Sequence, residues 1–273
     1  MAIPKKIHWC WLSGDPLPKN IQKCMNSWKR VMPDYEFVLW DKQRFDIHSV
    51  KFVEDACAAR KWAFAADYIR LYALYTEGGI YLDADVMVYR RFDKFLNHAA
   101  FSAVAYLRHA NSSRDEDKEY SGYSICGESF GAEKENEWIK MCLDSYKQKK
   151  FCMKDGKVNV EVIPNVLARY AHKYFGFNGY ERFDKPQILK GNLVIYPEKY
   201  LTYALGEISL RKTHAVHLAM DSWGNEYVPK SDILKPLRKF HHNWIKSHWL
   251  LSRLHYKRKQ WQNTIINKFR KHK

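Results

Sequence analysis

Two aspartates separated by a single residue, Asp83 and Asp85, are the residues best suited to chemistry in this sequence. They follow the short apolar run 80–82, which is preceded by Gly78 and Gly79. Side chains on an extended chain alternate between two faces, so both carboxyl groups would lie on one face. Hard divalent cations such as Mn²⁺ or Mg²⁺ bind such oxygens and complete their shell with water and phosphates. The pair therefore predicts a metal and phosphate site, with a solvated turn as the alternative.

A second charged pair, Asp67 and Arg70, comes shortly before these aspartates. Residues three apart on a helix share a face, so the two side chains would point the same way. One interpretation is a surface ion pair, which contributes little to stability. The other is that Arg70 contacts phosphate oxygens, and that Asp67 contacts hydroxyl groups of the same ligand. The sequence leaves both open.

The spacing of apolar residues predicts the elements that position these side chains. A helix is expected over 63–75, ended by two glycines. Near the N-terminus, strands over 3–12 and 36–40 flank a helix around 21–28, the order typical of a parallel sheet. Ligands of open α/β sheets bind at the carboxyl ends of strands, where the two aspartates would lie.

Further elements are expected beyond the aspartates. The predicted strands are 101–106, 123–126, 193–196 and 215–218, and the predicted helices are 135–149 and 164–174. Glu128 follows one of these strands and is interpreted as an ordinary loop acid, with a place near the site as the alternative. His8, His48 and His172 are interpreted as structural or surface histidines.

Positive charge is concentrated at the C-terminus. Residues 230–273 contain 13 Lys or Arg against one acid, so they carry +12 of the net charge of +16. Bulky apolar residues recur there at steps of three, four or seven: Phe240, Trp244, Leu251, Leu254, Trp261, Ile265 and Phe269. We expect a body over 1–229 and a basic amphipathic helical tail over 230–273 that docks on an anionic membrane surface. Packing of the tail on the body or on another subunit is the alternative.

The six cysteines lack C-x-x-C spacing, which indicates free thiols in a reducing compartment. The N-terminus lacks the pattern of a signal peptide, and no run reaches the roughly 18 apolar residues of a membrane span. These features predict a cytoplasmic protein, peripheral on the inner face of the cell membrane.

Four segments resemble a known family. The blocks 65–75 and 78–85 look like the signature of the D-x-D sugar-binding glycosyltransferases that build capsular and lipopolysaccharide chains. That family is similar to α-1,4-galactosyltransferases, yeast initiating mannosyltransferases and the catalytic domains of glucosylating toxins. The opening 3–11 matches its first strand, and 217–223 resembles its H-H-x-x-x-S-W pattern. The resemblance implies a glycosyltransferase A-type fold, a Rossmann-like mixed sheet flanked by helices.

The resemblance also implies roles for individual residues. Asp85 would ligate the metal directly, and Asp83 would face the ribose and a metal-bound water. His217, near the end of the resemblance, would supply a further protein ligand to the metal. Leu218 stands where the family often repeats His, so His217 alone must serve.

The remaining implied roles concern the donor. Asp67 and Arg70 would hold the donor sugar and, with the two later aspartates, act in catalysis. Trp11 would stack on the nucleotide base, and Ser222 with Trp223 would close over the diphosphate.

The expected reaction is transfer of a hexose, with Mn²⁺ or Mg²⁺, from a nucleotide-diphosphate sugar to a glycan acceptor. UDP-hexose is the first choice of donor and GDP-mannose the second. The acceptor would be lipopolysaccharide, O-antigen or capsule, linked to lipid, and the family retains anomeric configuration. Two alternatives stay open: a nucleic-acid or anionic-polymer binding protein, suggested by the tail, and a phosphohydrolase using the same aspartates. Because the excess charge is confined to the tail, no specific nucleic-acid partner is expected.

Overall fold

The structure of the chain is a computed structural model that describes residues 2–105, 120–151, 153–154, 157–158, 161–203 and 207–218. All of them belong to the compact unit Met1–Pro229. Ser222, Trp223 and the predicted tail 230–273 lie outside the described residues.

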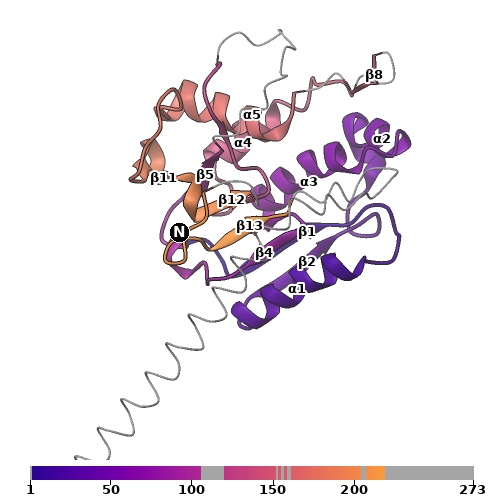
Figure 1. Cartoon of the computed structure of the whole chain (residues 1–273). Coiled ribbons are helices and arrows are strands. Elements are labelled where there is room, and N and C mark those ends of the chain that lie inside the picture. Colours follow the sequence, from indigo (N-terminus) through magenta and orange to yellow (C-terminus); the bar gives the residue numbers. More distant parts are fainter. Residues whose placement is uncertain are drawn as a thin grey trace, which may run out of the picture. The chain divides into compact units, whose positions relative to one another are not determined.

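A mixed sheet forms the centre of this unit (Figure 1). In order across the sheet its strands are β10 (Gln187–Ile188), β11 (Leu193–Tyr196), β5 (Ala100–Ala105), β7 (Ser129–Ala132), β3 (Gly79–Leu82), β1 (Lys6–Cys10) and β2 (Glu36–Trp40), with β6 (Ser124–Ile125) beside β5. The trio β2, β1 and β3 is parallel, whereas β7 runs antiparallel to both β3 and β5. A second sheet has the strand order β12 (Leu201–Tyr203), β13 (Ala215–His217) and β4 (Val86–Val88). A third consists of β8 (Met153–Lys154) and β9 (Lys157–Val158).

Helices flank the sheet. They are α1 (Lys19–Val31), α2 (Lys51–Ala58), α3 (Trp62–Glu77), α4 (Glu137–Asp144) and α5 (Ile163–Tyr170), with shorter turns η1 (Ile47–Ser49), η2 (Asp93–Phe95), η3 (Ala171–Phe175), η4 (Lys190–Asn192) and η5 (Glu198–Tyr200). Figure 1 shows α1 on one side of β1 and β2, with α2 and α3 on the other. Among the described residues, no helix combines the length and the apolar character needed to cross a membrane.

Helix α1 is fixed to the strand that follows the two aspartates. Its buried residues Ile21, Cys24 and Trp28 recur at helical spacing and form its apolar face. The indole Nε1 of Trp28 donates to the carbonyl of Val86 at 2.7 Å, and the backbone N–H of Val88 donates to the hydroxyl of Ser27 at 2.9 Å. Strand β4 is therefore held by helix α1 as well as by its sheet.

Two glycines make the turn from α3 into β3. Gly78 and Gly79 have φ angles of +67° and +121°, which other residues rarely adopt. A Cβ on Gly79 would lie 2.9 Å from the carbonyl oxygen of Lys6, so the neighbouring strand leaves no room for one. Buried His8 completes the turn, because its Nε2 donates to the carbonyl of Gly78 at 2.8 Å while its Nδ1 accepts from Trp40. The structural interpretation of His8 is confirmed.

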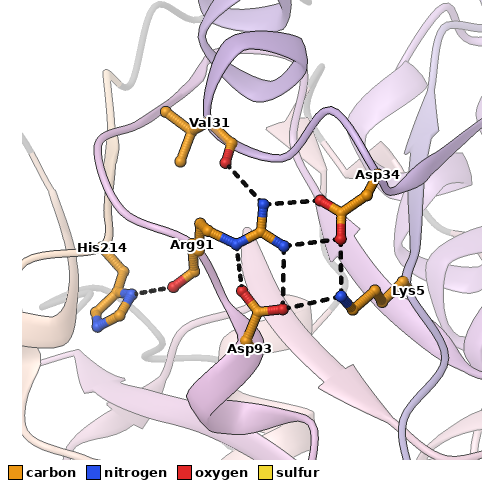
Figure 2. Close-up of polar contacts among 6 residues, drawn as sticks. All are labelled: Lys5, Val31, Asp34, Arg91, Asp93 and His214. Carbon is orange, nitrogen blue, oxygen red and sulfur yellow. Dashed lines mark hydrogen bonds and ion pairs between the residues drawn. The ribbon is translucent and has the colours of Figure 1, made fainter.

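A network of ion pairs centred on Arg91 connects segments near the start of β1 and the end of α1 (Figure 2). Arg91 binds Asp34 with a 2.7 Å contact and Asp93 with a 2.5 Å contact, and Lys5 also contacts both carboxyl groups. The carbonyl of Arg91 accepts from Nδ1 of His214 at 2.7 Å. The network therefore links the start of β1, the turn after α1 and the segment that enters β13.

The predicted mixed α/β class is confirmed, and several bounds need correction. The first strand covers only Lys6–Cys10, the helix expected over 135–149 ends at Asp144, and the helix expected over 164–174 changes at Ala171 into a π-helical turn. Strand β7 and helix α2 were not predicted. Strand β7 contains a serine and a glycine, so its pairing with β3 and β5, rather than its own residues, makes it a strand.

Candidate active site

Asp83, Asp85 and His217 come together at the end of β3. Each offers one ligand atom, and these atoms all lie within 4.8 Å of one another. His217 reaches this place because β13 pairs antiparallel with β4, which sets His217 opposite Val86, the residue after Asp85. Its Nε2 lies 3.1 Å from Oδ1 of Asp85. The fold thus places a histidine that is distant along the chain next to the aspartate motif.

The side chains of Asp83, Asp85 and His217 fit a divalent cation. Two carboxyl groups and an imidazole suit Mn²⁺ well, and also Mg²⁺ if water replaces the imidazole. Burial lowers the pKa of His217, but the charge and hydrogen bond of Asp85 raise it to about 10. In addition, His217 Nδ1 has no hydrogen-bond partner within the described part of the chain.

Arg70 lies beside Asp83 of this group and is only 4% exposed. Its Nη2 lies 3.0 Å from Oδ1 of Asp67 and 3.4 Å from Oδ1 of Asp83. Its Nη1 donates to the carbonyl of Gly127 at 2.5 Å, and its Cζ lies 4.5 Å from the centroid of the Tyr81 ring. The interpretation of Asp67 and Arg70 as a surface ion pair is wrong, because the pair is buried and connects α3 to the end of β3.

Asp67 is the more deeply placed of the two carboxyl partners of Arg70. Burial raises the pKa of Asp67 to about 7, although the charge of Arg70 and a hydrogen bond from the backbone of Ile163 act to lower it. The first residue of helix α5 therefore contacts this carboxyl group. A buried acid with a strongly shifted pKa beside a charged partner is typical of functional sites.

Asp83 is held from two directions. The hydroxyl of Tyr81 donates to its Oδ1 at 2.8 Å, and its own backbone N–H donates to the carbonyl of Glu128 at 2.9 Å. Glu128 is buried here, so its interpretation as an ordinary loop acid is wrong. No periodic pattern marks this residue, and only its place after a predicted strand indicated it.

Three further residues were predicted to bind the nucleotide-sugar donor, and of these only Trp11 lies among the described residues. Trp11 follows β1, is 9% exposed, and donates from Nε1 to the carbonyl of Asp15 at 2.7 Å. Its ring is thus fixed by the turn that follows the first strand. Ser222 and Trp223 lie outside the described residues.

Residues 18–102 match the family model described as the glycosyltransferase sugar-binding region containing a DXD motif. This match covers Asp67, Arg70, Asp83 and Asp85 and confirms the resemblance for that segment. His217 lies outside the matched residues, and the pairing of β13 with β4 brings it to the site.

Two curated proteins are similar to parts of the chain. Inositol phosphoceramide mannosyltransferase 3 of Schizosaccharomyces pombe is 33% identical over 104 residues, which are 37% of this chain and 29% of that protein. Subversion of eukaryotic traffic protein A of Legionella pneumophila is 25% identical over 174 residues, covering 54% of this chain and 25% of that protein. The chain therefore matches less than a third of the length of either relative.

A solved structure of the galactosyltransferase LgtC, in complex with donor and acceptor sugar analogues, is similar over 85% of this chain and 93% of its own. Its sequence identity is 12% and its TM-score is 0.48. A likeness at this level carries no conclusion about residues or substrates.

Proposed function

We propose that this chain is a metal-dependent glycosyltransferase that moves a hexose from a nucleotide-diphosphate sugar to a glycan acceptor. One observation carries the proposal: the Asp83, Asp85 and His217 group lies beside the buried Arg70 and Asp67 pair, and four of these five residues fall within the matched sugar-binding region. Metal ligands next to a buried arginine are suited to a diphosphate and the sugar attached to it.

The cation would be Mn²⁺, held by Asp83, Asp85 and His217, or Mg²⁺, held by the two aspartates with water in place of the imidazole. Bound there, it would act as a Lewis acid that neutralises negative charge developing on the leaving diphosphate. Asp85, being the more buried of the two motif aspartates, would be the direct ligand, and Asp83 would also face the ribose.

Arg70 and Asp67 would hold the donor sugar. Three of the Arg70 nitrogens already have protein acceptors, so the guanidinium also fixes the carboxyl groups of Asp67 and Asp83 in position. Trp11 would stack on the base, and Ser222 with Trp223 would cover the diphosphate.

The reaction would retain anomeric configuration by front-face substitution. The bond between the anomeric carbon and the diphosphate oxygen breaks while the bond to the acceptor oxygen forms on the same face. The leaving phosphate accepts the proton of the acceptor hydroxyl, so no separate base is required.

For the donor, we place UDP-hexose first and GDP-mannose second; the fission-yeast relative, named a mannosyltransferase, supports keeping the latter. The same name refers to a lipid acceptor, which supports a lipid-linked glycan such as lipopolysaccharide, O-antigen or capsule. Docking of residues 230–273 on the anionic inner face of the membrane would bring the enzyme to such an acceptor.

A screen of nucleotide sugars tests this function. Because a ligand that binds only the folded state raises the melting temperature, the correct donor should stabilise the protein in the presence of Mn²⁺ and be slowly hydrolysed. Chelation should abolish both effects. Release of inorganic phosphate without release of sugar would instead identify a phosphohydrolase, and stabilisation by random oligonucleotides alone would identify a nucleic-acid binder.

A further inference from the structure

One carboxyl group beside the metal-binding residues has no part in the function described so far. Glu128 is 4% exposed, and its Oε1 atom has no hydrogen-bond partner within the described ranges of the chain. Buried polar atoms nearly always have a partner, and leaving a carboxyl oxygen without one is costly. The Glu128 side chain therefore has an unused hydrogen-bonding capacity that a ligand would satisfy.

The backbone places Glu128 next to two site residues. Glu128 immediately precedes β7, whose first residue, Ser129, pairs with Leu82 at the end of β3. Its carbonyl accepts from the N–H of Asp83 at 2.9 Å, and the carbonyl of Gly127 accepts from Arg70. The position of Glu128 is thus fixed by the same contacts that fix the site.

The other side of Glu128 faces strands β12 and β13. The hydroxyl of Tyr203 donates to its Oε2 at 3.4 Å, and the Tyr203 ring packs edge-on against His217 with 5.2 Å between ring centroids. Glu128 is not among the three residues whose ligand atoms gather within 4.8 Å. The carboxyl group therefore lies beside the metal-binding group without belonging to it.

Extending the proposed function, on which this step rests, we infer that Oε1 of Glu128 accepts a hydrogen bond from a hydroxyl group of the donor hexose. A phosphate would repel this acid, whereas a sugar hydroxyl supplies the missing donor. The hexose of a nucleotide sugar is attached to the diphosphate, so its hydroxyl groups lie near the metal-binding residues. Tyr203 orients the carboxyl group from its other oxygen.

The experiment compares Glu128→Gln with the wild type in calorimetric titrations with Mn²⁺. Two ligands are titrated: the nucleotide sugar that stabilises the wild type, chosen from UDP-glucose, UDP-galactose and GDP-mannose, and its free nucleoside diphosphate. We expect affinity for the diphosphate to stay within about twofold, whereas affinity for the nucleotide sugar falls by about tenfold or more. The melting temperature of the ligand-free variant should stay equal or rise, because a poorly satisfied buried acid has been removed.

Glu198→Gln is the matched control, since Glu198 is 5% exposed and lies on η5 outside the site. Both of its affinities should stay at the wild-type value. Equal losses for the diphosphate and the nucleotide sugar in Glu128→Gln would make Glu128 a metal or phosphate group and overturn the inference. Unchanged affinities, or a large fall in melting temperature, would overturn it as well. If the wild type binds none of the three nucleotide sugars, the proposed function itself is wrong.

Discussion

Two arginines in this protein each bind two aspartates, and their surroundings differ. The side chains of Arg70, Asp67 and Asp83 are 5%, 8% and 15% exposed, whereas those of Arg91, Asp34 and Asp93 are 40%, 46% and 40% exposed. Exposed ion pairs contribute little, because water solvates and screens both charges. Burying the same groups is costly and leaves little gain in stability.

The difference indicates what each cluster does. The Arg91 network joins three segments that are separate in the sequence, which contain Lys5, Asp34 and Asp93 (Figure 2). The Arg70 cluster lies at the carboxyl end of a buried strand, beside a group suited to a cation. We infer that the Arg91 network stabilises the fold and that the Arg70 cluster serves chemistry.

The largest effect is expected for Asp85→Asn. It removes a charged ligand from the proposed metal site while preserving shape, so Mn²⁺-dependent sugar transfer or donor hydrolysis should be abolished. The melting temperature without metal should change by only a few degrees. Activity within threefold of the wild type, or activity that persists in chelator, would contradict the metal assignment.

The most direct test of the contrast replaces each arginine by lysine. Lysine keeps the charge but loses the planar arrangement of donors, so Arg70→Lys should lower turnover by roughly two orders of magnitude. Arg91→Lys is the matched control and should lower turnover by less than about twofold. Similar losses in both variants would show that the two clusters do not differ in function.

The pH dependence of stability reports on the Arg91 network through His214. Burial lowers the pKa of His214 to about 4, against an ordinary value of 6.5. The unfolded chain therefore binds more protons between these values, so this residue contributes stability above pH 6.5 that is lost as the pH falls towards 4. The melting temperature of His214→Gln should fall less between pH 7 and pH 5 than that of the wild type. A steeper fall in the variant would contradict this sign.

The smallest effect is expected for Arg91→Ala. Its partners stay in contact with water after the substitution, so no buried charge is left unpaired, and the melting temperature should fall by no more than a few degrees. Donor binding should be unaffected. A fall of more than about ten degrees in thermal unfolding would show that the exposed network matters more than its burial suggests.

Local patterns predicted the elements around the first four site residues. Helix α3 has a continuous apolar stripe and a two-glycine end, and β3 is a short apolar run, so both Asp67 with Arg70 and the two later aspartates could be placed from the sequence. The buried state of Arg70 could not, because it depends on contacts with residues outside α3, namely Asp83 and Gly127.

Elements that depend on tertiary pairing were not predictable. Strand β7 consists of Ser129, Phe130, Gly131 and Ala132, whose extended form comes from its two neighbouring strands. The burial of Glu128 follows from that pairing. The approach of His217 to Asp85 was expected only from the family resemblance, since no spacing rule connects residues so far apart.

The central claim is that Asp83, Asp85 and His217 bind a divalent cation together with a nucleoside diphosphate. Titration of Mn²⁺ followed by electron paramagnetic resonance, with UDP or GDP present, tests it most directly. We expect the wild type to bind one Mn²⁺ more tightly with the diphosphate than without it, and Asp85→Asn to lose this binding. Equal Mn²⁺ binding by both proteins, or none by the wild type, would contradict it.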